Sequence, residues 1–172
     1  MLHFGTLLAV MVYFRADIWE IIQGIGATLM GKEEGKQGEK LFLWIVLATL
    51  PTGIIGILFK DWFESLFSKP KIVGVMLLVT GLVLWVTRWA KKDRKKIERM
   101  GWMDSFLIGI AQGLAIIPGI SRSGATISTG LFCGLDRELS GKFSFLLSVP
   151  SILGAFLLEF KKTDLNQELW TI

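Results

Sequence analysis

The chain has 172 residues, of which 52% are hydrophobic and 20% charged, and its formal net charge is +4. This apolar fraction is higher than a soluble domain of this size usually carries, so the composition indicates a polytopic membrane protein. The basic residues cluster in loops between apolar runs, which argues against nucleic-acid binding. A single cysteine, Cys133, excludes an internal disulfide.

Apolar runs along the chain predict membrane-spanning helices, because a helix needs roughly 20 apolar residues to cross a hydrocarbon core about 30 Å thick. We expect complete spans over residues 41–59, 72–89 and 143–160. The opening run, residues 2–14, is shorter and is expected to be part of a span. The sequence therefore predicts an all-α, polytopic helical bundle that forms one membrane domain.

Loop charges predict the orientation of this bundle. The loop over residues 88–100 contains the densest group of basic residues and is expected in the cytoplasm, because cytoplasmic loops carry an excess of lysine and arginine. Residues 60–71 would then lie outside. Residues 15–40 would lie inside, with an interfacial helix over residues 18–30.

The segments 106–120 and 124–135 are each too short or too polar for a comfortable crossing. They predict two half-helices that meet at the turn PGISRSG, residues 118–124, and the pattern leaves open whether the pair re-enters or crosses the membrane. Non-helical backbone persists at membrane depth only where protein buries it or where it lines a wet cavity. The broken helix pair therefore marks a candidate functional site.

The residue types in this turn favour binding of an anion. Pro118 and Gly119 are expected to end the first half-helix, and Ser121 or Ser123 can cap the next one. The start of that helix presents free N–H groups and a partial positive charge. Arg122 adds a planar fork of donors that matches paired phosphate oxygens, so a phosphate or diphosphate is the expected ligand. The candidate residues are Gly119, Ser121, Arg122, Ser123, Gly124 and Thr126.

Simpler interpretations of the same residues remain open at this stage. An arginine near a membrane boundary can extend to the interface, and serines beside glycine can act only as caps or as small packing residues. Broken half-helices that point at an anion also occur in transporters, so a lipid-phosphate transporter or flippase is an alternative to an enzyme. A small structural subunit without a ligand is a third interpretation.

The run GIAQGLAIIPGISRSGATI, residues 109–127, closely resembles the second signature of the undecaprenyl-diphosphate phosphatase family, also called bacitracin-resistance proteins. The run FSFLLSVP at residues 143–150, the opening LHFGTLLAVMVYF and the run ATLPTGIIG at residues 48–56 are also similar to the family. Residues 139–142 depart from its usual linker. The resemblance covers most of the chain.

This resemblance implies an integral membrane hydrolase of the bacterial cytoplasmic (inner) membrane, with its site facing outside. Such an enzyme converts undecaprenyl diphosphate to undecaprenyl phosphate and phosphate, which recycles the lipid carrier for peptidoglycan synthesis and confers bacitracin resistance. The resemblance also implies a divalent cation, magnesium or calcium, and allows a homodimer. It assigns catalytic roles to Ser121, Arg122, Ser123 and Thr126, and substrate-binding roles to Gly119 and Gly124 together with Arg122.

The family's first signature, a glutamate-rich segment followed by a histidine-containing turn, has no counterpart in these residues. His3 is the only histidine; it matches a different family position and is expected to be a packing or interfacial residue. We therefore expect an internal fragment of a longer phosphatase, without the first signature or the last helices, without a metal site of its own and inactive alone. The remaining acidic candidates are expected to be solvated or at a boundary: Glu33, Glu34, Glu159, Asp164 and Glu168.

Overall fold

The computed structural model describes residues 2–29, 36–90 and 95–169. In these ranges the chain is helical and contains no β-strand beyond one isolated bridge. The expected all-α architecture is confirmed. The helices are α1 (Leu2–Tyr13), α2 (Arg15–Leu29), α3 (Lys36–Leu58), α4 (Lys60–Phe67), α5 (Pro70–Val86), η1 (Thr87–Trp89), η2 (Ile97–Arg99), α6 (Trp102–Leu114), α7 (Arg122–Phe132) and α8 (Arg137–Leu169).

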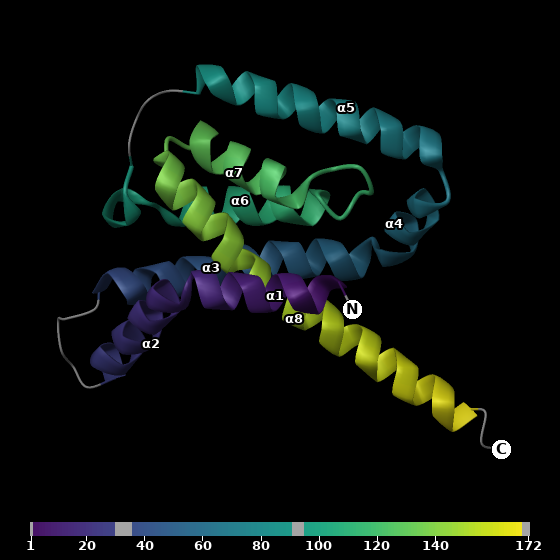
Figure 1. The fold of residues 1–172 in the computed structure, drawn as a ribbon, viewed down its shortest axis with the longest axis horizontal. Helices are drawn as coiled ribbons and strands as arrows, with labels where there is room; N and C mark the ends of the chain where they lie inside the picture. Colours follow the sequence, from purple (N-terminus) through teal and green to yellow (C-terminus); the bar gives the residue numbers. More distant parts are fainter. Residues whose placement is uncertain (1, 30–35, 91–94, 170–172) are drawn as a thin grey trace.

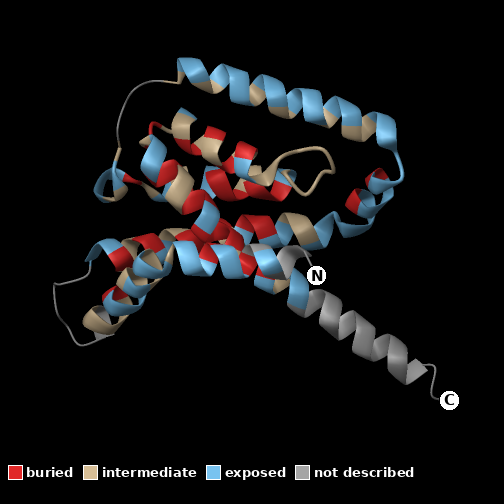
Figure 2. Ribbon diagram, viewed as in Figure 1, coloured by how far each residue is buried: buried red, intermediate tan, exposed pale blue. Residues whose placement is uncertain are grey.

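Three stretches of the described chain are helical, long and apolar enough to cross a membrane: Lys36–Leu58, Pro70–Trp89 and Arg137–Phe156. They overlap the three complete spans expected from the sequence. Much of the apolar surface on these helices is exposed, and α5 contains no buried residue at all (Figure 2). Exposed apolar helix faces on this scale are stable in lipid and unfavourable in water. The chain is an integral membrane protein.

Two helices begin where local chemistry places them rather than where hydropathy rises. α8 begins six residues before the predicted span because Asp136 caps it, with Oδ1 accepting the Leu139 N–H at 2.6 Å. α5 begins at Pro70, since a proline at the first helical position lacks only an N–H that would be unpaired there. The predicted outer loop 60–71 contains the short helix α4, which buries Phe63 on its inner face.

The core lies between α3, α6 and α8, and α5 lies along one side of the bundle next to α7 (Figure 1). Buried apolar side chains from the three central helices, from the segment before α6 and from the connection between α7 and α8 form one cluster, and Figure 2 shows this concentration of buried residues. The cluster consists of Leu41, Ile45, Ala48, Met100, Ile108, Leu135, Leu139, Phe143, Leu146 and Leu147. This core fixes α6 relative to the two spanning helices.

α6 packs closely against α3 because small residues face each other at the contact. A Cβ atom on Gly109 would collide with the backbone of Ala48, so only glycine allows this separation. The hydroxyl of Thr52 donates to the carbonyl oxygen of Gly109 at 2.8 Å, and the hydroxyl of Ser105 donates to that of Trp44 at 2.5 Å. Close backbone approach with polar contacts is a usual way for membrane helices to associate.

The half-helices α6 and α7 form a hairpin whose two outer ends meet at one residue. The backbone N–H of Lys95, in the segment that leads through η2 into α6, donates to the Gly134 carbonyl at 2.9 Å, and the Asp136 N–H donates to the Lys95 carbonyl at 3.1 Å. The Lys95 ammonium also lies 3.4 Å from the carboxylate of Asp104 in the first turn of α6. The pair therefore enters and returns at the same end of the bundle.

α6 ends at Leu114, six residues earlier than the predicted limit of 120. The reason is Pro118, whose ring clashes with the carbonyl of the residue four positions before it and which cannot donate to that carbonyl. Leu114 is that residue. It accepts instead from the Ile117 N–H at 3.2 Å, in a tighter turn that leads out of the helix.

α7 occupies Arg122–Phe132 rather than the predicted 124–135. Its start is set by Ser121, which occupies the N-cap position with extended backbone dihedrals. Its end is set by Gly134, which has φ +87° and donates its N–H to the Leu131 carbonyl at 3.0 Å. Glycine in this left-handed conformation is a frequent helix terminator.

Candidate functional site

The turn between α6 and α7 presses directly against α5. Gly119 has φ +96°, a backbone conformation that other residues rarely adopt. A Cβ atom there would collide with the carbonyl oxygen of Val73 and lie 2.9 Å from the Cβ of Met76. The sequence-predicted Gly119 is therefore required both by its dihedral angle and by the space that α5 leaves.

Thr80 of α5 makes two hydrogen bonds to the backbone of this turn. Its hydroxyl donates to the Gly119 carbonyl at 3.2 Å and accepts from the Ser121 N–H at 3.2 Å. Sequence reasoning missed Thr80 because nothing local connects it with residues about forty positions later. The one available signal was that Thr80 is the sole hydroxyl side chain in the apolar run of α5.

Ser121 caps α7, as the sequence allowed. Its Oγ accepts from the Gly124 N–H at 3.1 Å and lies 3.5 Å from the Oγ of the exposed Ser123. The first amides of α7, those of Arg122 and Ser123, make no hydrogen bond within the part of the chain that the structure describes. The helix N-terminus thus keeps free donors of the kind that bind anions.

Arg122 stands at the first position of α7 and is half-buried. Its guanidinium makes no ion pair or hydrogen bond with any of the described residues. An arginine in an apolar protein normally finds a carboxylate or carbonyl partner, because an unpaired charge away from water is costly. The free fork beside free amides therefore favours an anionic ligand at this point.

Thr126 faces away from the turn. It is 1% exposed, and its hydroxyl lies 2.9 Å from the Arg122 carbonyl and 2.5 Å from the Oγ of Ser144 on α8. In this structure the hydroxyl joins α7 to α8. The structure thus brings Gly119, Ser121, Arg122, Ser123 and Gly124 together at the start of α7, and the catalytic role of Thr126 stays a prediction.

A second group of buried polar residues lies between α3, α6 and α8. Gln112 is 2% exposed and donates from Nε2 to the Oγ of Ser151 at 2.6 Å, while its Oε1 has no partner among the described residues. Thr52 lies 3.5 Å from the same Nε2. Sequence reasoning did not single out these residues, since each is separately compatible with ordinary helix packing.

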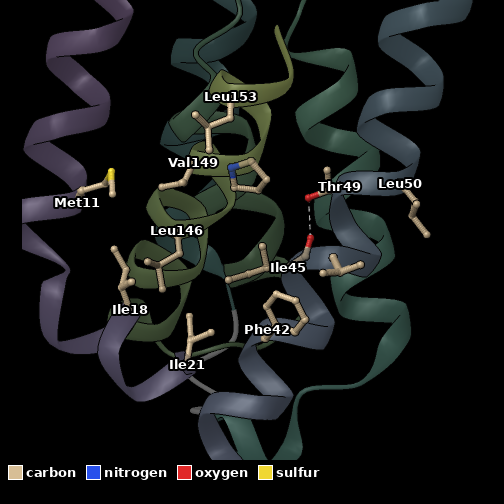
Figure 3. A pocket seen from close by; sticks show the side chains of 12 residues that line it. Met11, Ile18, Ile21, Phe42, Ile45, Thr49, Leu50, Leu146, Val149 and Leu153 are labelled. Atoms are coloured by element: carbon tan, nitrogen blue, oxygen red, sulfur yellow. Dashed lines mark hydrogen bonds between the residues drawn. The ribbon is translucent and has the colours of Figure 1, made fainter. Parts of the chain in front are cut away.

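Two hollows flank the central helices. A crevice of about 200 Å³ between α5 and the hairpin is lined by Thr80, Thr129, Gly124 and apolar side chains, so it opens next to the start of α7. A larger hollow of about 370 Å³ lies among α1, α2, α3 and α8, where no residue of the hairpin lines it (Figure 3). Its one polar side chain, Thr49, donates to the Ile45 carbonyl at 2.7 Å, so the larger hollow offers nothing to a phosphate.

The described residues contain no group of three histidine, cysteine, aspartate or glutamate side chains able to hold a metal ion. This statement does not cover several of the acidic residues, or the histidine, that were named from the sequence. Glu33 and Glu34 lie outside the described residues, as do the side chains of His3, Glu159, Asp164 and Glu168.

Comparison with known proteins places the chain in a family. The family model "Bacitracin resistance protein BacA" matches residues 1–172. The chain belongs to the BacA family. This BacA chain is 47% identical over 167 residues to an undecaprenyl-diphosphatase of Alkaliphilus metalliredigens, with 94% of the chain and 61% of the relative covered. It is 54% identical over 128 residues to one of Methanothermobacter thermautotrophicus, covering 73% of the chain and 71% of the relative.

A third relative, the undecaprenyl-diphosphatase of Carboxydothermus hydrogenoformans, is 44% identical over 161 residues, which is 94% of the chain and 57% of the relative. The BacA chain thus spans about three fifths of the length of the curated relatives that match most of it. The family resemblance seen in residues 109–127 is confirmed.

Proposed function

We propose that this chain forms the diphosphate-binding part of an undecaprenyl-diphosphatase. The observation that carries the proposal is the guanidinium of Arg122, which has no partner among the described residues and lies beside first-turn amides of α7 that have none there either. The names of the relatives support the same substrate. In the reaction, water attacks the terminal phosphorus, the bond from phosphorus to the bridging oxygen breaks, and undecaprenyl phosphate and inorganic phosphate are the products.

The turn would bind and orient the diphosphate rather than supply covalent chemistry. Arg122 can pair two phosphate oxygens, and the amides of Arg122 and Ser123 can donate to a third. These fixed donors would also stabilise charge on the phosphoryl group as it is transferred, and such stabilisation supplies most of the catalysis in phosphoryl transfer. The Oγ of Ser121 already accepts the capping hydrogen bond from Gly124, so Ser121 would contact the ligand as a donor, through its O–H.

The crevice between α5 and the hairpin suits the lipid part of the substrate. It adjoins the start of α7 at Gly124, and most of its lining is apolar, with Val79 and Val83 on α5 facing Leu114 and Ile120. A polyprenyl diphosphate could therefore place its head at the turn and its first isoprene units in this crevice. That arrangement explains why an anion site lies beside an otherwise lipid-exposed helix.

A divalent cation, magnesium or calcium, belongs to the proposal only through the family resemblance. The donors at the turn are hydroxyls, amides and a cationic arginine, which do not fit a metal ion, and the described residues contain no acidic cluster that does. No step of the proposed reaction is assigned to a cation.

The wider role follows from the same proposal: the enzyme recycles the carrier lipid for peptidoglycan synthesis and so confers bacitracin resistance. It would do so in the cytoplasmic membrane, as a monomer or a homodimer. Its orientation is proposed from charge. The open end of the hairpin lies at Lys95, within the basic loop 88–100, which positive-inside bias puts in the cytoplasm. The turn PGISRSG then points toward the outer face.

The test measures binding of undecaprenyl diphosphate to the chain in nanodiscs, for wild type, Arg122→Ala and Arg122→Lys. We expect the alanine variant to bind at least tenfold more weakly, since a charge-assisted bidentate contact is lost, and the lysine variant to fall between. Arg99→Ala, in the basic loop, is the matched control. Equal affinity of wild type and Arg122→Ala would refute the proposal.

A second assay separates hydrolase from transporter. Phosphate release in liposomes is measured for the chain alone and together with a segment of a relative that carries the first signature. We expect release only with the added segment. Movement of the lipid across the bilayer without phosphate release in either case would instead support the transporter alternative.

A further inference from the structure

Thr80 occupies an unusual position for a hydroxyl in a lipid-exposed helix. Threonines in membrane helices commonly return their hydroxyl to a carbonyl of their own helix, and Thr49 and Thr129 of this chain do so, donating to the residue four positions earlier. Thr80 instead bonds to another element, the turn before α7. Its hydroxyl therefore contributes to the arrangement of the turn.

The face of α5 that carries Thr80 is shaped to receive the turn. Val73, Met76 and Thr80 recur at helical spacing, so they lie on one side of α5. The first two limit the space around Gly119, and the methyl group of Thr80 lies 3.6 Å from the place of a Cβ on Gly124, in the first turn of α7. α5 thus contacts both the strained glycine and the start of the anion-binding helix.

The two hydrogen bonds fix the backbone on either side of Ile120. With the Gly119 carbonyl and the Ser121 N–H both tied to one oxygen, the peptide units that lead into the N-cap have a defined orientation. Ser121 then directs its Oγ at Gly124, and the amides of Arg122 and Ser123 follow from that cap. Free donors bind an anion well only when they are held in place before it arrives.

We propose that Thr80 is a positioning residue for the diphosphate site, acting through the backbone of residues 119–121 and not by touching the diphosphate. The inference rests on the proposed function. It assigns to α5, a helix with no buried residue, an indirect part in binding the diphosphate.

The decisive variant is Thr80→Val, which keeps the shape and removes the hydroxyl, measured as binding of undecaprenyl diphosphate in nanodiscs. We expect the variant to bind about tenfold more weakly, which corresponds to the loss of roughly one pair of positioning hydrogen bonds. Thr80→Ser restores the hydroxyl and should bind within about twofold of wild type. Thr49→Val is the matched control, since that hydroxyl bonds only within α3 and should leave affinity unchanged.

A double-variant comparison distinguishes positioning from general stabilisation. If Thr80 acts through the arginine site, Thr80→Val should weaken binding about tenfold with Arg122 present and at most about twofold in an Arg122→Ala background, because interacting residues are not additive. Amide exchange of ¹⁵N-serine-labelled chain should show faster exchange at Ser121 in Thr80→Val with little change in the melting temperature.

The outcomes separate the two proposals. Weaker binding by Arg122→Ala with unchanged binding by Thr80→Val would overturn the role of Thr80 and leave the proposed function standing. Unchanged binding by both would overturn both. Equal loss in the wild-type and Arg122→Ala backgrounds, or a lowered melting temperature with unchanged affinity, would make Thr80 a structural residue only and also overturn the inference.

Discussion

Gly109→Ala is the most direct test of how the bundle positions the site, because α6 touches the backbone of α3 there. An added Cβ would lie 2.7 Å from Cγ of Pro51 and 2.8 Å from Cα of Ala48. The carbonyl oxygen of Ala48 would lie closer still, so α3 and α6 must separate by on the order of one ångström. Neither neighbour can rotate away, since one is a ring and the other is backbone. Overpacking of this kind costs about 1–3 kcal/mol.

The matched control is Gly81→Ala in α5, where nothing lies within 4 Å of the added Cβ. Both changes replace glycine by a better helix former, which favours alanine by up to about 1 kcal/mol, so this contribution cancels when the two variants are compared. Gly109→Ala should therefore be less stable than Gly81→Ala by about 1–3 kcal/mol, the overpacking cost itself. Gly113→Ala, which meets the side chain of Ile55 at 2.7 Å, should fall between them.

The assay is reversible unfolding in mixed micelles by titration with sodium dodecyl sulfate, followed by helical circular dichroism. Binding of undecaprenyl diphosphate is measured on the same samples, and Gly109→Ala should weaken it because the turn is carried at the end of α6. Equal unfolding free energies for Gly109→Ala and Gly81→Ala would show that α3 and α6 are not in close contact and would refute the reasoning.

Two further predictions concern the ends of α7. Ser121→Asp should keep the cap to Gly124 and the stability of wild type. It should bind undecaprenyl diphosphate at least tenfold more weakly, because it places a negative charge at the site. Unchanged affinity in nanodiscs would show that the diphosphate does not bind at this turn. At the other end, burial raises the pKa of the Cys133 thiol, Asp104 raises it further, and Lys95 acts in the opposite direction. Because the thiolate is the reactive form, the rate of alkylation by iodoacetamide should reach half its maximum at a higher pH in the folded chain than in the unfolded chain. Asp104→Asn should lower the pH of this midpoint in the folded chain. A midpoint in the folded chain at or below that of the unfolded chain would contradict the prediction.

The sequence predicted those features that depend on composition and on near neighbours along the chain. The long apolar runs gave the spanning helices, since length and hydropathy are sufficient for that purpose. Pro118 and Gly119 predicted the break between α6 and α7, and Ser121 was named as a possible cap; each acts within four residues of its own position. The residues that form the turn between α6 and α7 could therefore be named from the sequence alone, and their role in binding an anion stays a prediction.

Features that depend on helix packing were not predictable in the same way. Thr80 gained its role because α5 lies against the turn, and Gln112 because three helices meet around it. Thr126 shows the converse: its type and place in the motif suggested the site, whereas the structure turns its hydroxyl toward Ser144. Hydropathy also did not predict the early start of α8, because the cap at Asp136 lies in a polar stretch ahead of the apolar run.

The closure of the hairpin at Lys95 makes the length of α6 a determinant of depth. With 13 residues rising about 1.5 Å each, α6 is about 20 Å long, which equals roughly two thirds of a hydrocarbon core about 30 Å thick. Insertion of one residue in α6 would move the turn by about 1.5 Å and rotate it by about 100° around the helix axis. Deletions or insertions here should therefore be tolerated far less than in the loops, even where every residue of the turn is retained.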